Sequence, residues 1–176
     1  MKKFILILIM LFCNYKINGQ NDFFSIQAFQ NEWEIINDDV MGGVSHGEIG
    51  IDNNKLIFSG KLSSKFNGGF ASIRTRERIQ LNNHEKINLR IIGDGNTYQI
   101  RIKDNNFNYY SYAHEFKTSG LEQYISLSLS EFKPVFRGTY ISSDNFNKKL
   151  ITELTFMIVS KKEPEFNLQI IEIIIN

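Results

Sequence analysis

Hydrophobic and polar residues alternate along most of this chain. Tyr98, Ile100 and Ile102 are separated by polar side chains, and the same period of two recurs elsewhere, at 56–62, 87–91, 125–129 and 154–158. Strict alternation indicates strands with one face in a core and the other in water. Turn signals rich in Asn and Asp lie between these segments, at 52–54, 82–83 and 104–106, and no segment carries a helical stripe over three turns. The pattern predicts an all-β fold, an antiparallel β-sandwich or barrel.

The two ends of the pattern are less regular. Segment 166–175 switches phase at Ile170-Ile171, which a β-bulge would explain, as would a central strand buried on both faces. Segment 22–31 fits either a short helix or an extended strand. We find no internal repeat and no linker, so we expect one domain.

The first residues resemble an export signal. Two lysines follow Met1, and 4–13 form an apolar run too short to span a bilayer. We expect a signal peptide over 1–19, a single domain over 20–176, and a periplasmic or secreted protein without a transmembrane span in its mature chain. Cys13 raises lipid anchoring as an alternative, but Phe12 before it is bulky where lipoprotein signals have a small residue.

Charge and cysteine content exclude several functions. The leader would remove Lys2, Lys3 and Lys16 from 20 basic residues, leaving 17 against 19 acidic ones, a formal charge of −2. A nearly neutral domain lacks the basic surface that nucleic-acid binding requires. Cys13 is the only cysteine and lies in the leader, so thiol catalysis, disulfides and thiolate metal sites are not expected.

A loop of carboxylates and glycines is the first candidate site. Asn37, Asp38 and Asp39 are followed by Gly42 and Gly43, residue types that strands disfavour. The glycines allow a tight backbone path. The loop is either a shaped ligand site or an ordinary turn with solvated carboxylates.

A second candidate begins at Asn67-Gly68-Gly69 and continues as a strand. In an extended conformation Arg74 shares a polar face with Ser72 and Arg76, where its guanidinium could grip a ligand. Arg74 could instead pair with Asp38 or Asp39 and hold the loop in place. We expect Asp38, Asp39 and Arg74 to lie close together, with all three and Asn37 and Asn67 as ligand or partner contacts.

Secondary candidates lie in the middle of the chain. The segment 93–96 is typical of a hairpin turn, with Asp94 as a ligand contact in the alternative interpretation. Tyr98 belongs to an apolar row, which favours the core. Tyr110 lies in an aromatic cluster at 107–112 that could pack inward or offer stacking platforms for sugars.

Metal binding and catalysis have little support. Oxygen donors in the first loop would suit Ca²⁺, but no EF-hand loop is present, so no cofactor is expected beyond a structural calcium as an alternative. His46, His84 and His114 lack the spacing of a zinc site. No nucleophile elbow, phosphate loop or dinucleotide fingerprint occurs. Asp38 or Asp39 paired with Asp94 or Glu115 leaves a glycoside hydrolase as a remote alternative.

These motifs occur together in a recognisable order. The set comprises Trp33, the nonamer 37–45, the segment 67–74, Gly93-Asp94-Gly95 with Tyr98, and Phe132, Pro134 and Arg137-Gly138. It resembles the complex I intermediate-associated protein 30 family from Phe29 to the C-terminus. The resemblance implies a galactose-binding-like jelly roll and a non-catalytic helper in assembly of a respiratory complex. The export leader departs from that family's best-known members and leaves the respiratory client in question.

Three function classes therefore remain. A protein-binding assembly or chaperone-like factor of the cell envelope predicts an exposed apolar patch. A carbohydrate-binding module predicts a concave groove with one or two exposed rings and paired polar groups. A hydrolase predicts two carboxyl groups that face one another across a cleft. We expect the partner to be a protein client or a glycan, bound without catalysis.

Overall fold

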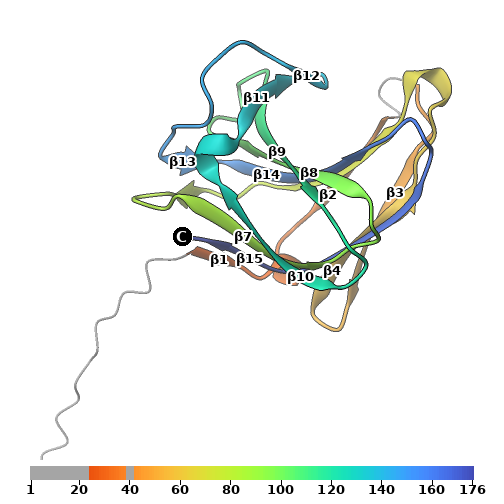
Figure 1. Cartoon of the computed structure of the whole chain (residues 1–176), viewed down its shortest axis with the longest axis horizontal. Helices are drawn as coiled ribbons and strands as arrows, with labels where there is room; N and C mark the ends of the chain where they lie inside the picture. Colours follow the sequence, from red (N-terminus) through yellow and green to blue (C-terminus); the bar gives the residue numbers. More distant parts are fainter. Residues whose placement is uncertain (1–23, 39–41) are drawn as a thin grey trace, which may run out of the picture.

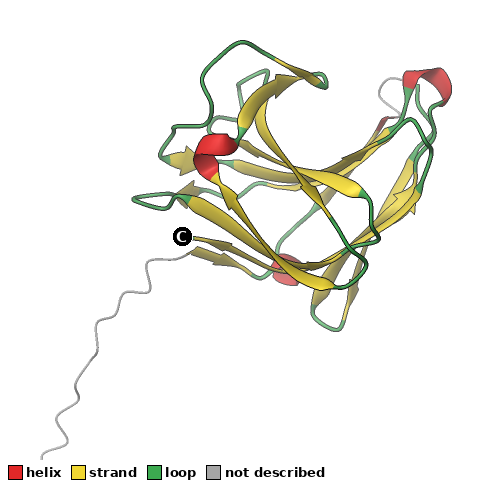
Figure 2. Cartoon of the chain, viewed as in Figure 1, coloured by secondary structure: helices red, strands yellow, loops and turns green. Residues whose placement is uncertain are grey.

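Two antiparallel sheets packed face to face form the body of the molecule (Figures 1 and 2). The structure is a computed structural model that describes residues 24–38 and 42–176. The expected signal peptide and Asp39 lie outside the described residues. Among the helices of the described part of the chain, none has the length and hydrophobicity needed to cross a bilayer. The prediction of an antiparallel β-sandwich is confirmed.

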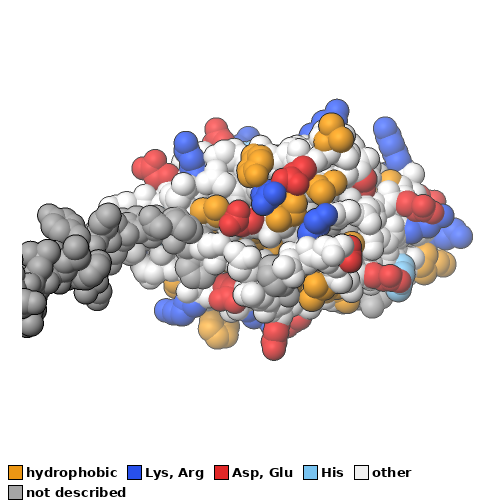
Figure 3. Space-filling view, turned by 90° about the horizontal axis from the view of Figure 1, so that it is seen from below, with side chains coloured by type: hydrophobic (Ala, Val, Ile, Leu, Met, Phe, Trp, Pro, Cys, Tyr) orange, Lys and Arg blue, Asp and Glu red, His pale blue; other side chains and the backbone are white. Residues whose placement is uncertain are grey.

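One sheet has six strands and places the C-terminal strand near its middle. Its order is β10 (Glu122–Ser128), β7 (Lys86–Ile92), β15 (Glu165–Ile175), β4 (Lys55–Lys61) and β3 (His46–Asp52), and β1 (Phe24–Ile26) pairs with the end of β15. Figure 3 views the molecule from the side of this sheet, where acidic, basic and hydrophobic side chains are interspersed.

The second sheet has seven strands. Its order is β12 (Thr139–Tyr140), β11 (Lys133–Phe136), β9 (Ser111–Lys117), β8 (Thr97–Lys103), β14 (Glu153–Val159), β5 (Phe70–Thr75) and β2 (Glu34–Asn37). A small third sheet joins β13 (Leu150–Ile151) to β6 (Ile79–Gln80). Three short 3₁₀ helices complete the described elements: η1 (Ala28–Gln30), η3 (Lys65–Asn67) and η4 (Leu129–Glu131).

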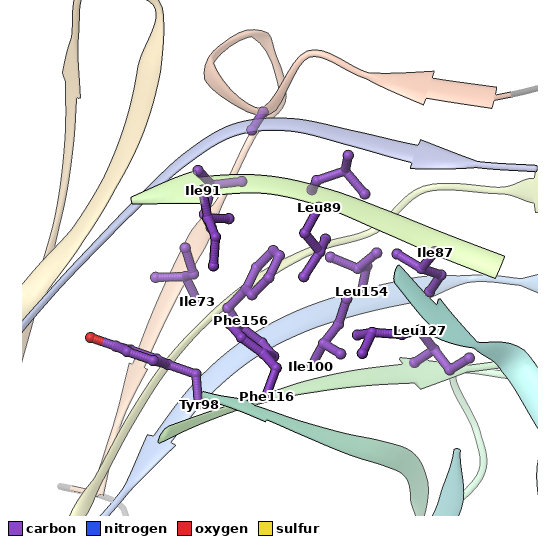
Figure 4. Close-up of a cluster of buried hydrophobic side chains, with 14 of the residues drawn as sticks. Ile73, Ile87, Leu89, Ile91, Tyr98, Ile100, Phe116, Leu127, Leu154 and Phe156 are labelled. Atoms are coloured by element: carbon purple, nitrogen blue, oxygen red, sulfur yellow. The ribbon is translucent and has the colours of Figure 1, made fainter. Parts of the chain in front are cut away.

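The core lies between the two large sheets and takes its side chains from the apolar rows of the sequence (Figure 4). Leu89 and Ile91 of β7 face Ile100 of β8 and Phe156 of β14, and all four are fully or almost fully buried. Trp33 packs at the edge of this core, with its ring centroid 5.9 Å from that of Phe156. Its indole N–H donates to the carbonyl of Ala28 at 2.7 Å. Because strand residues alternate between faces, burying these rows leaves the intervening polar residues on the two outer faces.

At each irregular end of the chain, the structure contains both of the alternatives that the sequence allowed. The register of β15 against β7 shifts between Ile170 and Glu172, as a bulge requires, and β15 is also a central strand between β7 and β4. The N-terminal segment forms the extended β1 and then the short helix η1.

The prediction of a β-hairpin at 93–96 is wrong. The strands that it joins, β7 and β8, belong to different sheets, so the segment is a corner that crosses the sandwich. Asp94 holds this corner: its carboxylate accepts hydrogen bonds from the backbone N–H of Asn167 at 2.7 Å, from that of Asn96 at 2.9 Å, and from the hydroxyl of Tyr98 at 2.9 Å. A dipeptide typical of hairpins marks a turn, but it does not say which sheet receives the next strand.

Replacing Tyr98 tests the role of this corner. The ring is completely buried, and its hydroxyl has the Asp94 carboxylate as partner. We expect Tyr98→Phe to lower the free energy of unfolding by about 1.5–3 kcal/mol, because one hydrogen bond to a charged group is lost. Urea denaturation would measure it. Tyr124→Phe, at a ring that is largely exposed on β10, is the matched control and should leave stability unchanged. Equal stability of the two variants would contradict the assignment.

Candidate functional site

The carboxylate of Asp38 is a buried structural anchor. It accepts hydrogen bonds from the backbone N–H of Ser45 at 3.0 Å, the Ser45 hydroxyl at 2.6 Å, the N–H of Gly69 at 2.7 Å and that of Phe70 at 3.4 Å. The Ser45 hydroxyl oxygen in turn accepts from the N–H of Ser63 at 3.0 Å. Asp38 is completely buried, so its oxygens are occupied by the chain itself and cannot reach a ligand.

Hydrogen bonding keeps Asp38 ionised despite its burial. Burial acts to raise the pKa of its carboxyl group, but donors from Ser45, Gly69 and Phe70 outweigh that effect and hold the pKa below the ordinary value. The carboxylate therefore ties together the end of β2, the segment before β3 and the start of β5.

Two of the predicted loop glycines make room for this carboxylate. A Cβ atom at Gly43 would lie 2.2 Å from Cγ of Asp38, and one at Gly68 would lie 2.4 Å from its Oδ2. Gly69 has a φ of +116°, and a Cβ there would lie 2.8 Å from the carbonyl oxygen of Ser160. Gly42 has a φ of +79° in open space. The expectation that these glycines shape the loop therefore has a physical basis in the structure.

The predicted proximity of Asp38 and Arg74 is wrong. Arg74 pairs instead with Glu34, whose Oε2 lies 2.8 Å from Nη2, and Glu153 lies 3.8 Å from Nη1. Register explains this, because Arg74 is opposite Glu34 at the start of β2, whereas Asp38 follows the other end of that strand. Glu34 and Asp38 are four residues apart, which is about 13 Å along an extended strand.

The other residues predicted as ligand contacts differ in what the structure shows of them. The side-chain oxygen of Asn37 accepts from the N–H of Gly47 at 3.1 Å, which links β2 of one sheet to β3 of the other. Asn67 ends η3, and its side chain is outside what the structure describes, as is Asp39. Tyr110 is half-buried between Tyr109 and Tyr112, so it packs rather than offers an open platform.

A different surface gathers polar side chains: the outer face of the seven-stranded sheet. Cross-strand register aligns two rows there, each running perpendicular to the strands. One row reads Lys133, Ala113, Arg101, Thr155, Arg74 and Glu34 across six strands, from β11 to β2. The adjacent row reads Glu115, Gln99, Met157, Ser72 and Ile36.

A hydrogen-bonded chain organises the centre of this face. Nε and Nη2 of Arg101 donate to the side-chain oxygen of Gln99 at 3.0 and 2.6 Å, and Nε2 of Gln99 donates to Oε1 of Glu115 at 2.9 Å. Burial lowers the pKa of Arg101, and the nearby Tyr140 and Glu115 oppose this effect. Three planar polar groups are thus held in fixed positions before any ligand arrives.

The hairpin of β11 and β12 adds an aromatic wall beside that chain. Tyr140, which is half exposed, lines a hollow of about 420 Å³ together with Ala113, Glu115 and Lys133. Burial raises the pKa of the Tyr140 hydroxyl, as does nearby Glu115, so the phenol is neutral at physiological pH. Ala113 is the small residue that leaves the floor of this hollow open.

The sequence analysis missed Arg101, Gln99, Glu115 and Tyr140 as a group. The polar alternation of β8 marked Gln99 and Arg101 as outward-facing, but only the pairing of β8 with β9 brings Glu115 beside them. As for metals, residues 24–38 and 42–176 contain no group of three or more His, Cys, Asp or Glu side chains arranged to hold an ion.

The architecture is an antiparallel jelly-roll sandwich of the galactose-binding-like kind, which is the fold expected from the sequence. The chain belongs to the complex I intermediate-associated protein 30 family, whose family model matches residues 22–170. The family resemblance found in the sequence is thereby confirmed. No curated protein sequence matches the chain.

Solved structures share the fold at low sequence identity. A family 11 carbohydrate-binding module from Clostridium thermocellum, in complex with a β-1,3-1,4-mixed-linked tetrasaccharide, has a TM-score of 0.65 and 15% identity, over 86% of this chain and 94% of that one. The family 11 module of cellulase Lic26A-Cel5E from the same organism has a TM-score of 0.60 and 15% identity, over 81% and 86%. An agarase, AgWH50C, has a TM-score of 0.60 and 13% identity, over 88% of this chain but 24% of its own.

The space occupied by Asp38 can be tested at Gly43. A Cβ there would overlap the buried carboxylate, so we expect Gly43→Ala to lower the free energy of unfolding by about 3 kcal/mol. Gly50→Ala is the matched control, because its Cβ would meet nothing closer than 3.8 Å. Thermal or urea denaturation distinguishes the two, and a Gly43→Ala variant as stable as Gly50→Ala would refute the anchor.

Acid titration tests the ionised state of Asp38. Because its folded pKa is depressed, the carboxylate stabilises the fold above the unfolded-state pKa of about 3.9, and this stabilisation is lost as pH falls through the folded pKa. We expect Asp38→Asn to lower the unfolding free energy at pH 7 by about 2–4 kcal/mol and to lose less stability than the wild type on acidification. The Asp38→Asn variant should still lose some stability in acid, because other carboxyl groups, such as that of Asp94, also have lowered pKa values. Denaturation curves from pH 7 to 3 would decide, and parallel losses in both proteins would count against this role.

Proposed function

We propose that this protein is an exported, non-catalytic binding domain that recognises a glycan on the outer face of its seven-stranded sheet. The observation that carries the proposal is the hollow lined by the half-exposed ring of Tyr140 and by Glu115, which ends the hydrogen-bonded chain from Arg101 through Gln99. A ring face suits the apolar side of a pyranose, and planar polar groups suit its hydroxyls.

The floor of the site fits an extended ligand. The row from Lys133 to Glu34 crosses six strands, so its length is about 24 Å at the usual strand spacing. A chain of sugars laid across the strands would meet a polar side chain at most steps. The family 11 module in complex with a tetrasaccharide shares this fold and supports the proposal, since the same architecture can bind an oligosaccharide.

Protein binding is the second candidate function. Membership of a family named for a complex I intermediate favours an assembly or chaperone-like factor acting on a protein client in the cell envelope. Exposed aromatic residues also favour it, since Phe107 and Tyr109 are largely exposed. The rings of Tyr109 and Phe136 are perpendicular, with centroids 5.1 Å apart, and the guanidinium of Arg137 lies 5.3 Å from the centroid of Phe136. Such a cluster is the kind of apolar patch that a protein partner covers.

Affinity electrophoresis and calorimetry against a panel of neutral and anionic polysaccharides would test the glycan proposal. We expect Tyr140→Ala to weaken binding about tenfold, since it removes the stacking ring. Arg90→Ala is the control, because Arg90 lies on the outer face of the six-stranded sheet and pairs with Glu122. Unchanged glycan binding by Tyr140→Ala would place the site elsewhere. Stoichiometric capture of one envelope protein, lost in a Tyr109→Ala variant and without glycan binding, would favour the second candidate.

A further inference from the structure

Three cations on the outer face of the seven-stranded sheet have no acidic partner. Among the described residues, no carboxylate oxygen lies within 4 Å of the charged nitrogens of Arg101, Lys103 or Lys133. Lys103 is opposite Glu153 in the β8–β14 register, yet its Nζ donates to the carbonyl of Asn108 at 2.9 Å instead. Arg101 and Lys103 are two residues apart on β8 and therefore point to the same side.

The acidic groups of the same surface already have partners. Glu34 pairs with Arg74 and Arg76 at 2.8 and 2.7 Å, and Glu153 approaches both arginines at 3.8 and 3.9 Å. Glu115 accepts from Gln99, and Glu131 lies 3.4 Å from the ring of His114. The β2 and β5 end of the face is thus neutralised internally, whereas at the β8, β9 and β11 end the cations Arg101, Lys103 and Lys133 outnumber the carboxylates Glu115 and Glu131 and pair with neither.

Arg101 has the geometry to bind an anion. Two of its five N–H groups donate to Gln99, which fixes the plane of the guanidinium and leaves the edge formed by Nη1 and Nη2 free of protein acceptors in the described structure. Burial lowers the pKa of this side chain and nearby Glu115 opposes the shift only in part, so a further anion would stabilise its charge. A planar carboxylate or a sulfate ester would satisfy that edge with two hydrogen bonds.

Lys133 is placed to bind a second anionic group. It is exposed, and it lies two strands from Arg101 in the same row, with the small Ala113 between them. Two strand spacings are about 10 Å. An extended polysaccharide crossing the strands would bring alternate sugar rings to these two cations, while the ring between them would rest over Ala113 beside Tyr140.

We propose that the ligand of this face is an anionic glycan, a polymer of sugars bearing carboxylate or sulfate groups, with one anionic group on Arg101 and another on Lys133. This inference rests on the proposed glycan-binding function and specifies its ligand class.

Matched polysaccharide pairs that differ only in charge test the proposal. The purified protein is titrated with polygalacturonate and with its carboxyl-reduced form, and with a sulfated galactan and its desulfated form. We expect at least tenfold tighter binding to one anionic polymer than to its neutral counterpart, because charge-assisted hydrogen bonds are stronger than neutral ones. Salt screens charges, so this binding should weaken as the salt concentration rises from 50 to 500 mM. Which pair shows the difference identifies carboxylate or sulfate as the recognised group.

Variants assign the effect to Arg101. Arg101→Gln should weaken binding of the anionic polymer roughly tenfold to a hundredfold and abolish its preference over the neutral form. Arg101→Lys should restore part of the affinity because it restores charge but not the planar fork. Lys133→Gln should cost a smaller factor, and Arg90→Gln on the opposite face should cost nothing.

The outcomes separate the two proposals. Equal binding of charged and neutral polymers, with loss in Tyr140→Ala, would overturn the anionic ligand while leaving glycan binding intact. A charge preference that persists in Arg101→Gln would overturn the assigned site. No binding to any polymer would refute both proposals.

Discussion

The buried carboxylate of Asp38 is the interaction on which the geometry of the sandwich edge depends. Four donors from Ser45, Gly69 and Phe70 surround it, and Gly43 and Gly68 have no side chains because a Cβ would overlap it. A carboxylate is costly to bury unless its lone pairs are satisfied. Once they are satisfied, the same group holds together the end of β2, the segment before β3 and the start of β5, where β2 and β3 are edge strands of two different sheets.

A second carboxylate has the same role at another crossing between the sheets. Asp94 binds the hydroxyl of Tyr98 and the backbone of Asn167 where the chain passes from β7 to β8. Charge-assisted hydrogen bonds thus hold both crossings, while apolar rows fill the interior. In the described part of the chain, the outer face of the seven-stranded sheet, where we propose that the ligand binds, contributes no side chains to either carboxylate.

The sequence predicted the scaffold better than the candidate binding surface, because strand patterns are local in the sequence whereas strand pairing joins distant segments. Alternation is a local property, so the strands around Ile100 and Phe156, and the phase switch at Ile170, could be recognised without a structure. Strand pairing is not local: the expected link between Arg74 and Asp38 failed because β5 registers Arg74 against Glu34. Likewise Arg101, Gln99 and Glu115 were each visible as polar positions, but no sequence pattern showed that β8 and β9 bring them together.

The same distinction between scaffold and outer surface explains why family membership predicts the fold rather than the ligand. The residues that carry the family resemblance here, among them Asp38, Gly43, Asp94 and Tyr98, are ones that the structure uses for its loop and its corner. These residues determine the scaffold, that is, the loop around Asp38 and the crossing from β7 to β8. In the proposed function, ligand choice depends on outward positions such as Arg101 and Tyr140, where a substitution changes the surface without disturbing the core. Two members could therefore share every signature residue and still bind chemically different partners.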